Sequence, residues 1–399
     1  IRNSLQTSMK ESVDLFSFRL VLYVVFLAII PSYIVYTTKI NYKSLKGEIV
    51  SKLKTIILSL VIIFIIIFSF SKFYTSFFRE HKPLRYNINP IYWIYSIGNY
   101  VNKTLDTAPT EIKDIGLDAK IVEEENEPKE LIILVIGETA RADRFSLNGY
   151  SKETNPLLKQ EELVSFTNMS SCGTSTAHSV PCMFSIFPKD DYSYKKGAGT
   201  KNVLDVLNNT QDVAILWRDN NSDSKGVALR VDYEDFQTPK TNSVCDEECR
   251  DEGMLVGLED YVEKNKGRDI LIVLHQMGKH GPAYYKRYPK EFEKFTPVCK
   301  TNQLDECTQE EVSNAYDNAI LYTDYFLSKA INFLKKYSKT HEAGLLYVSD
   351  HGESLGENGI YLHGMPYAIA PKAQTHVASL IWLDNGQMSH EYDRSKIKQ

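Results

Sequence analysis

The chain has 399 residues, enough for two or three domains and for the core of a full enzyme. Its formal net charge of −5 hides an asymmetry, because residues 1–105 carry 13 Lys and Arg against 4 Asp and Glu, and the rest of the chain is acidic. The acidic part has no basic patch with interleaved aromatic residues, which argues against a nucleic-acid partner. The chain begins with Ile and shows no signal peptide, so we expect it to lack an original N-terminal portion.

Two uncharged apolar segments lie in the basic part, at residues 20–38 and 55–71. As helices of about 1.5 Å per residue they would be roughly 26 to 28 Å long, close to the thickness of the hydrocarbon layer of a membrane. Buried core helices are the alternative, but the run VIIFIIIF in the second segment has no polar face that could meet water. We therefore predict two membrane-spanning helices.

The segment between these spans, KINYKSLKGEIVSKLK, contains five Lys and one Glu. Short lysine-rich loops stay in the cytoplasm, so we expect the outer ends of both spans to face the periplasm. The aromatic stretches KFYTSFF and PIYWIYSIGNY indicate an interfacial belt and a helix that lies on the membrane surface. We expect a transmembrane region in residues 1–72, an interfacial helix and linker in 73–130, and a periplasmic domain in 131–399.

All six cysteines lie after residue 171, and they form close pairs in the sequence. Neighbour pairing by local closure predicts three disulfides, which require an oxidising compartment such as the periplasm. The alternative for CDEEC is half of a zinc site, but no second Cys or His pair lies at a matching spacing. The expected pairs are Cys172 with Cys182, Cys245 with Cys249, and Cys299 with Cys307.

Four short apolar runs in the acidic part each end abruptly in a polar cluster. The runs are LIILVIG (131–137), VAILW (213–217), DILIVLH (269–275) and GLLYVS (344–349). Runs of this length, rich in Val, Ile and Leu and separated by helical spacers, predict buried strands of a parallel sheet in an α/β domain. Ligands bind outside the carboxyl ends of such strands, which is where all four polar clusters fall.

Glu138 follows the first of these runs, and Asp350 with His351 follows the last. Two carboxylates and an imidazole suit a divalent ion such as zinc or manganese. An Asp at the end of a strand can also be a simple helix cap. The predicted metal site therefore depends on Glu138 joining Asp350 and His351 from a different strand.

Two further clusters offer groups that could handle a phosphate. His280 and His363 are each followed by Gly, which lets a substrate approach closely, although a structural role in a loop is the alternative for each. Asn221 and Lys225, in NNSDSKG, offer an amide and a cation of the kind that steadies a phosphate oxygen, with an ordinary solvated loop as the alternative. His275 and the remaining histidines are expected to be structural.

Three hydroxyl residues, Thr174, Ser175 and Thr176, stand between Cys172 and Cys182 where a helix is expected to begin. Backbone N–H groups at the start of a helix attract a phosphate. Metal coordination lowers the pKa of a hydroxyl by many units and so creates a nucleophile near neutral pH. These features predict that the segment supplies a nucleophile. The alternative is a turn closed by a disulfide, whose hydroxyls only cap the helix.

Five ordered motifs closely resemble the bacterial lipid A phosphoethanolamine transferases, a family that includes colistin-resistance determinants. They are IGETARADRFSLNGY, CGTSTAHSVPCMFS, LWRDNNSDSKG, HQMGKHGPAYYKRYP and SDHGESLGENGIYLHGMPYAIAP, and the resemblance runs from about residue 131 to 382. It implies an alkaline-phosphatase-like periplasmic domain, with a central, mostly parallel sheet flanked by helices, preceded by transmembrane helices in the bacterial inner membrane. Family members typically have five spans, and only the last two have counterparts here.

Carried over position by position, the resemblance implies a zinc site and a substrate site. Zinc is expected on Glu138, Thr176, Asp350 and His351, with Thr176 as the nucleophile. Contacts to the phosphoethanolamine group are expected from Thr174, Asn221, Lys225, His280 and His363. His178 stands where the family more often has Tyr, a difference that could tune access to the nucleophile.

The implied activity is transfer of phosphoethanolamine from phosphatidylethanolamine to lipid A or a related periplasmic acceptor. The group would rest covalently on Thr176, and His280 or His363 would protonate the diacylglycerol that leaves. We expect a monomer that works on two lipids at the membrane. The alternatives are a metal-dependent phosphodiesterase, sulfatase or phosphoglycerol transferase of the same superfamily, and a membrane-tethered metal-binding protein without catalytic activity.

Overall fold

The computed structural model describes residues 17–39, 44–70, 90–107, 111–122 and 128–384. These residues form two compact units, with the boundary between Asp106 and Thr107. The expected aromatic belt KFYTSFF lies outside the described residues, as does part of the expected linker.

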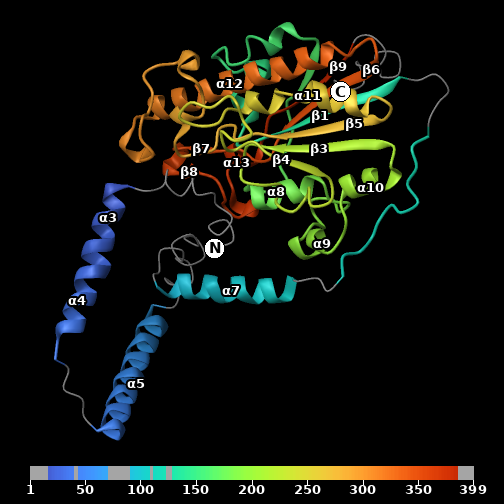
Figure 1. Ribbon diagram of the computed structural model, residues 1–399. Coiled ribbons are helices and arrows are strands. Elements are labelled where there is room, and N and C mark those ends of the chain that lie inside the picture. Colours follow the sequence, from blue (N-terminus) through green and yellow to red (C-terminus); the bar gives the residue numbers. More distant parts are fainter. Residues whose placement is uncertain (1–16, 40–43, 71–89, 108–110, 123–127, 385–399) are drawn as a thin grey trace. The chain divides into compact units, whose positions relative to one another are not determined.

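The first unit contains two helices that are long and apolar enough to cross a membrane (Figure 1). One is continuous over Phe18–Thr37 and consists of α3 (Phe18–Val24), a π-helical turn (Val25–Ile29) and α4 (Ile30–Thr37). The wide turn ends two residues before Pro31, which lacks an N–H and whose ring would clash with the carbonyl four residues earlier in a regular helix. The other is α5 (Leu45–Ser69).

Helix α5 begins ten residues before the predicted span at 55–71, so most of the lysine-rich segment is helical rather than a loop. Ser44 caps this helix, because its hydroxyl accepts a hydrogen bond from the N–H of Gly47 at 3.4 Å. Lys and Glu favour helix as strongly as Leu does, and hydropathy marks the apolar part of a helix but not its start. A third helix, α7 (Ile91–Thr107), covers the predicted surface helix.

The second unit is built on a seven-stranded sheet with the order β2–β9–β6–β1–β5–β3–β4 in the described residues. Its strands are β1 (Lys129–Gly137), β2 (Leu163–Phe166), β3 (Val213–Asp219), β4 (Asp232–Asp235), β5 (Asp269–His275), β6 (His341–Ser349) and β9 (Ser379–Leu383). Neighbours from β6 to β4 are parallel, and β9 runs antiparallel to both β6 and β2. The four predicted strands correspond to β1, β3, β5 and β6, and the fold class is as expected.

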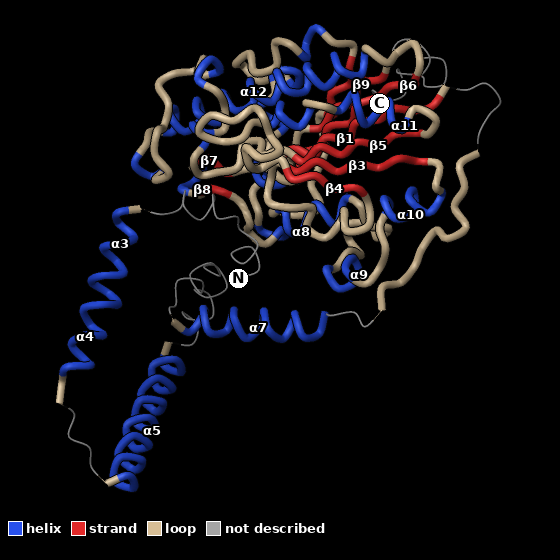
Figure 2. Tube along the Cα trace, in the orientation of Figure 1, coloured by secondary structure: helices blue, strands red, loops and turns tan. Residues whose placement is uncertain are grey.

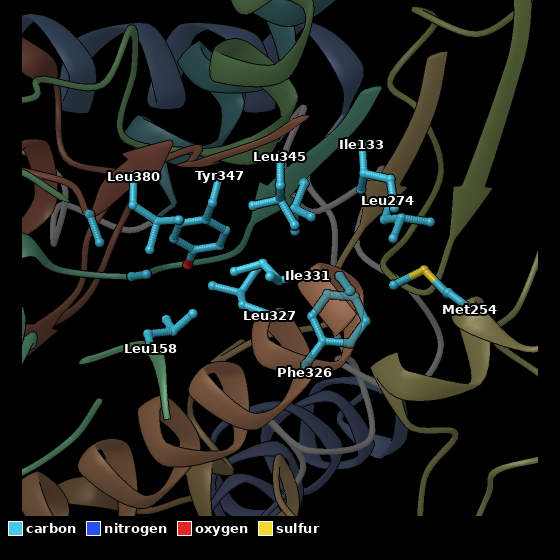
Figure 3. Close-up of a cluster of buried hydrophobic side chains, with 14 of the residues drawn as sticks. Ile133, Leu158, Met254, Leu274, Phe326, Leu327, Ile331, Leu345, Tyr347 and Leu380 are labelled. Atoms are coloured by element: carbon cyan, nitrogen blue, oxygen red, sulfur yellow. The ribbon is translucent and has the colours of Figure 1, made fainter. Parts of the chain in front are cut away.

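Helices cover both faces of this sheet (Figure 2). On one face, Phe326, Leu327 and Ile331 of the long helix α12 pack with Leu345 and other residues of the central strands (Figure 3). The other face buries Trp217 of β3 against residues of α8 and α10. The helices of this unit are α8 (Thr176–Met183), α9 (Tyr194–Ala198), α10 (Val203–Thr210), α11 (Leu258–Asn265), α12 (Gln309–Lys335) and α13 (Lys372–Thr375).

Three disulfides and one short strand pair constrain the connections of the second unit. The disulfides are Cys172–Cys182, Cys245–Cys249 and Cys299–Cys307, the three pairs expected from the sequence. A small antiparallel pair, β7 (Ser354–Leu355) with β8 (Tyr361–Leu362), shapes the segment after β6.

The orientation of the first unit can be tested with a single introduced cysteine, because all six native cysteines are paired. If the lysine-rich segment faces the cytoplasm, Ser44→Cys will not react with a membrane-impermeant maleimide in intact spheroplasts and will react after permeabilisation. Lys240→Cys, at an exposed position of the second unit, is the control and will react in both. Labelling of residue 44 in intact spheroplasts would contradict the predicted orientation.

Candidate active site

The polar residues that follow the parallel strands meet at one edge of the sheet. Pairing of Gly137 with Ser349 and of Ile136 with His275 brings the ends of β1, β6 and β5 side by side. Asp219, the last residue of β3, is also paired with His275. Because carboxyl ends of parallel strands share an edge, the residues that come next converge there.

Glu138, Asp350 and His351 form a compact, fully buried group at this edge. His351 Nε2 lies 3.3 Å from Glu138 Oε1 and 3.4 Å from Asp350 Oδ2. Glu138 Oε1 and Asp350 Oδ2 are buried, and among the described residues neither has a hydrogen-bond partner. Buried carboxylate oxygens without donors are rare, and a metal ion between them would satisfy both.

The hydrogen bond at the other nitrogen of His351 prepares this ring as a ligand. Its Nδ1 lies 2.9 Å from the carbonyl oxygen of Gly352. A carbonyl only accepts, so Nδ1 carries the hydrogen and Nε2 of the neutral ring carries a lone pair directed at the two carboxylates. Metal-binding histidines are held by the same kind of support.

The three groups also shift one another's pKa. Burial would raise the pKa of Glu138, but the imidazoles of His351, His280 and His363 together outweigh burial and hold that pKa well below its usual value. Burial, with the charge of Glu138, raises the pKa of Asp350. Burial would lower the pKa of His351, yet Asp350 and Glu138 raise it to about 10. The group therefore requires a cation, which is either a proton on His351 or a bound metal ion.

Thr176 brings a hydroxyl to this group from the first residue of α8. Its Oγ1 donates to Glu138 Oε2 at 3.0 Å and lies 3.3 Å from His351 Nε2. The segment before it is held by the Cys172–Cys182 disulfide and by a hydrogen bond from Gly173 N to Ser179 Oγ at 2.8 Å. Two carboxylates, an imidazole and a hydroxyl are donors that suit zinc, so these four side chains fit the expected metal.

Thr174 joins the segment that carries Thr176 to the segment that carries His363. Its hydroxyl donates to the carbonyl of Met365 at 2.6 Å, and its own carbonyl accepts from Gly364 N at 2.8 Å. The hydroxyl hydrogen is therefore engaged by the protein in this structure. The contact with phosphoethanolamine that the sequence indicated for Thr174 stays a prediction.

Asn221 lies within the site and supports Glu138. Its Nδ2 donates to Glu138 Oε2 at 2.9 Å and to the carbonyl of Gln276 at 2.8 Å, which uses both amide hydrogens. The ammonium of Lys225 bonds within its own loop, to Ser222 Oγ at 2.6 Å. Their contacts with substrate likewise stay predictions.

His280 and His363 lie together beside His351. The ring centroids of His280 and His363 are 5.8 Å apart, and those of His351 and His363 are 4.2 Å apart. His363 Nδ1 lies 2.7 Å from a carboxylate oxygen of Glu353, and His280 Nδ1 lies 2.9 Å from the carbonyl of Gly281. The structure thus places two imidazoles of fixed orientation next to the carboxylate group.

Glu353 is a site residue that the sequence did not single out. Its buried carboxylate accepts from Tyr284 OH at 2.6 Å and from His363 Nδ1, so it fixes the His363 ring. Ligand atoms of His351, Glu353 and His363 also lie within 4.8 Å of one another. In the sequence, Glu353 could have been found from its position two residues after His351, within one of the five motifs that resemble the family.

Asp219, the last residue of β3, is a second site residue that the sequence did not single out. Its carboxylate accepts from His275 Nδ1, Trp217 Nε1 and Asn221 N, each at 2.9 Å. His275 is fully buried, in agreement with the structural role expected for it. Asp219 therefore fixes the start of the loop that carries Asn221 and Lys225.

The glycine in MGKHG lets the loop after β5 pass close to Glu138. Gly278 has a φ of +54°, and a Cβ there would lie 3.0 Å from both the Cβ and the carbonyl oxygen of Glu138. A side chain at this position would strain the backbone and displace the carboxylate.

We expect Glu138→Gln to lose bound metal, because it removes a charged ligand from a buried site. Purified protein dialysed against a fixed low zinc concentration should hold at least about tenfold less zinc than the parent, measured by inductively coupled plasma mass spectrometry. Glu130→Gln, an exposed position on the same strand, is the control. An unchanged zinc content in Glu138→Gln would contradict the ligand assignment.

Asp219→Ala should destabilise the second unit by about 3 kcal/mol, because it leaves three buried donors without their acceptor. The measurement is the midpoint of urea unfolding followed by tryptophan fluorescence, which Trp217 reports directly. Asp212→Ala, an exposed change just before the other end of β3, should shift the midpoint little. Equal shifts for the two variants would show that the Asp219 contacts do not hold the loop.

Two family models and several known proteins match the chain. Residues 130–398 match the sulfatase family model, and residues 1–105 match the model described as phosphoethanolamine transferase EptA/EptB. The chain is 48% identical to the phosphatidylethanolamine transferase Mcr-2 of Escherichia coli, over 96% of this chain and 73% of that protein.

Two solved structures of this kind are similar to the chain. The integral membrane lipooligosaccharide phosphoethanolamine transferase A of Neisseria meningitidis matches with a TM-score of 0.93 and 36% identity, over 100% of this chain and 74% of that one. The periplasmic domain of phosphoethanolamine transferase EptC from Campylobacter jejuni matches with a TM-score of 0.62 and 45% identity, over 70% of this chain and 85% of that one. The chain belongs to the lipid A phosphoethanolamine transferase family, whose members join membrane-spanning helices to a sulfatase-type metalloenzyme domain.

Proposed function

We propose that this protein transfers phosphoethanolamine from phosphatidylethanolamine to a phosphate or sugar hydroxyl of lipid A, through a covalent adduct on Thr176. The observation that supports this most is the position of the Thr176 hydroxyl, bonded to Glu138 and close to His351 in a buried set of ligands. A hydroxyl that only capped α8 would bond to backbone N–H groups of that helix. Ser175, which holds the capping position, makes no such side-chain bond.

Glu138, Thr176, Asp350 and His351 would hold a zinc ion. When bound, zinc lowers the pKa of a coordinated hydroxyl and stabilises negative charge on phosphoryl oxygens. The chain's own contribution is to fix these groups in a dry site, where Asn221 and the helix start add positive potential.

In the first half-reaction, Thr176 Oγ1 attacks the phosphorus of phosphatidylethanolamine while its proton passes to Glu138 Oε2, the oxygen to which it donates. The bond from phosphorus to the glycerol oxygen breaks, and phosphoethanolamine remains on Thr176. The departing diacylglycerol oxygen takes a proton from an imidazole. The geometry favours His363 for this role, because the Glu353 carboxylate at its Nδ1 stabilises the protonated ring and leaves Nε2 to give up its proton.

In the second half-reaction, an oxygen of lipid A attacks the same phosphorus, and the Thr176 oxygen leaves and takes its proton back from Glu138. The imidazole that lost a proton to diacylglycerol can accept one from an acceptor hydroxyl, so the cycle closes. Both substrates are lipids, which agrees with membrane helices on the same chain and with a periplasmic location of the second unit. We further propose that the catalytic domain is residues 131–399 and that the protein acts as a monomer.

Thr176→Ala should abolish both the adduct and the transfer, since it removes the one oxygen assigned to attack. The fold should persist, because the loss of a methyl and a hydroxyl here costs about 1–2 kcal/mol. Thr176→Ser restores the hydroxyl without the methyl group that limits its rotamers, so partial activity should return. Intact-mass spectrometry after incubation with phosphatidylethanolamine, and lipid A mass spectrometry from cells, measure the two steps.

The same mass measurement separates this proposal from its alternatives. Turnover of phosphatidylethanolamine to free phosphoethanolamine without an adduct would indicate a hydrolase. No change in protein or lipid would indicate a metal-binding protein. An adduct that persists in Thr176→Ala on the peptide of residues 171–184 would move the nucleophile to Thr174 or Ser175.

A further inference from the structure

The CDEEC segment packs beside the candidate site, although it supplies none of the groups assigned to zinc or to substrate. Asn220, in the loop that also carries Asn221, donates from Nδ2 to the carbonyl of Cys249 at 3.1 Å and to Asp251 Oδ1 at 2.8 Å. The Cys245–Cys249 disulfide closes the segment over a sequence separation of 4, and cross-links over such short loops stabilise a protein least. The contacts of this segment therefore say more about its role than its contribution to stability does.

Asp251, directly after this segment, holds the beginning of the loop that carries His280. Its buried carboxylate accepts from the backbone N–H of Met277 at 2.9 Å and from that of Gly278 at 3.1 Å. Gly278 is the residue that passes close to Glu138. The loop of residues 276–287, which we call the His280 loop, is thus attached at its first end to the residues that follow the disulfide.

Glu248 and Arg250 hold the other end of the His280 loop. Arg287 Nη1 donates to both carboxylate oxygens of Glu248, at 2.5 and 2.6 Å. The side chain of Arg287 is fully buried and that of Glu248 is 6% exposed, so this ion pair is shielded from water. Arg250 Nη1 donates to the carbonyl of Lys286 at 2.7 Å. Both ends of the loop are therefore attached to one short stretch of chain that a disulfide constrains.

Arg287 also makes a direct contact with the residue between these ends. Its Nε donates to the carbonyl oxygen of His280 at 2.6 Å, and a bond from a guanidinium is stronger than one from a neutral donor. The His280 ring is held separately, because its Nδ1 lies 2.9 Å from the carbonyl of Gly281. Arg287 fixes the main chain and Gly281 fixes the ring, which together set the position of this imidazole beside His363.

We propose that the buried Glu248–Arg287 pair positions His280 for its contact with the phosphoethanolamine group, an inference that rests on the proposed function. Stability alone does not account for such a pair, since apolar residues of the same volume usually stabilise a protein as well as a buried ion pair does. Position matters more, because a shift of about 1 Å in a reacting group can slow a reaction by about a hundredfold. Arg287 and Glu248 are thus positioning residues that act through His280.

The test replaces the pair in the full-length protein by Glu248→Leu with Arg287→Met. Both charges are removed together, so neither is left buried and unpaired, and the fold should persist. The readout is the initial rate of phosphoethanolamine adduct formation from dioleoyl phosphatidylethanolamine, followed by intact mass. The midpoint of urea unfolding is measured on the same samples.

Glu161→Leu with Lys335→Met is the matched control. Lys335 Nζ donates to both carboxylate oxygens of Glu161, at 2.8 and 2.6 Å. Glu161 lies just before β2, and Lys335 ends α12 just before β6 begins, so this pair lies toward the edge of the sheet opposite the site.

We expect the Glu248–Arg287 variant to form the adduct about tenfold more slowly, with an unfolding midpoint close to that of the parent. The control should stay within about twofold in rate. In a His280→Ala background, the Glu248–Arg287 variant should slow the reaction by less than about twofold more, because a pair that acts through His280 has nothing left to position. Equal slowing in both backgrounds would overturn the proposal, as would an unchanged rate in the first.

Arg287→Lys is a conservative variant for the same cycle. It keeps a buried cation beside Glu248 but replaces the planar fork by a single ammonium, so it should fold and slow the reaction by a smaller factor. It takes the place of the double substitution if that protein does not fold.

Hydrogen exchange followed by mass spectrometry tests the positioning without catalysis. Peptides that cover residues 276–283 should exchange faster in the Glu248–Arg287 variant than in the parent, and those that cover 171–184 should exchange equally in both. Unchanged exchange at 276–283 would overturn the proposal. If the parent forms no adduct, the proposed function fails, and the exchange still decides whether the pair holds the His280 loop.

Discussion

The structure of the site depends on the burial of two carboxylates, Glu138 and Asp350, at the ends of adjacent strands. Both are fully buried, and burial together with the charge of Glu138 raises the pKa of Asp350. Two such groups can remain ionised together only if a cation lies between them. His351 and Asn221 supply part of that compensation, and the orphaned oxygens Glu138 Oε1 and Asp350 Oδ2 mark where a metal ion would supply the rest.

Thr176, the proposed nucleophile, reaches this centre by a different route from the other three side chains. Glu138, Asp350 and His351 follow strands, so the parallel sheet alone places them at one edge. Thr176 begins a helix instead, and its position depends on the Cys172–Cys182 disulfide and on the bond from Gly173 to Ser179. The positive end of the α8 dipole lies at Thr176, where the proposed reaction would develop phosphate charge.

The sequence predicted what local patterns encode. The apolar, buried runs correctly predicted the strands β1, β3, β5 and β6. The ends of β1 and β6 also correctly predicted the edge of the sheet at which Glu138, Asp350 and His351 lie. Strand β4 has the sequence DYED and is exposed throughout, so it carries no apolar alternation to detect. The short strands β2 and β9 became strands by pairing with each other and with β6, which is a tertiary effect.

Asp219 and Glu353 escaped the sequence analysis for the same reason. An acidic residue at the end of a strand or in a loop resembles any solvated carboxylate until its partners are known. The partner His275 of Asp219 comes from another strand, and Tyr284, a partner of Glu353, lies 69 positions away in the chain. Each carboxylate accepts one hydrogen bond from a distant segment of the chain and another from a group in or next to the site. Its role can therefore be recognised only in the folded chain.

These contacts explain how loops can hold a reaction geometry. Thr174 makes two hydrogen bonds to the segment of Gly364 and Met365, so the nucleophile segment and the His363 segment are joined directly. Glu353 then fixes the His363 ring, and Glu138 accepts the hydrogen of Thr176. The Thr176 hydroxyl and the His363 imidazole, to which we assign the attack and the protonation of the leaving group, are thereby held in one network. A phosphorus bound between them needs no rearrangement of the protein to meet both, which is the entropic advantage that a preorganised site provides.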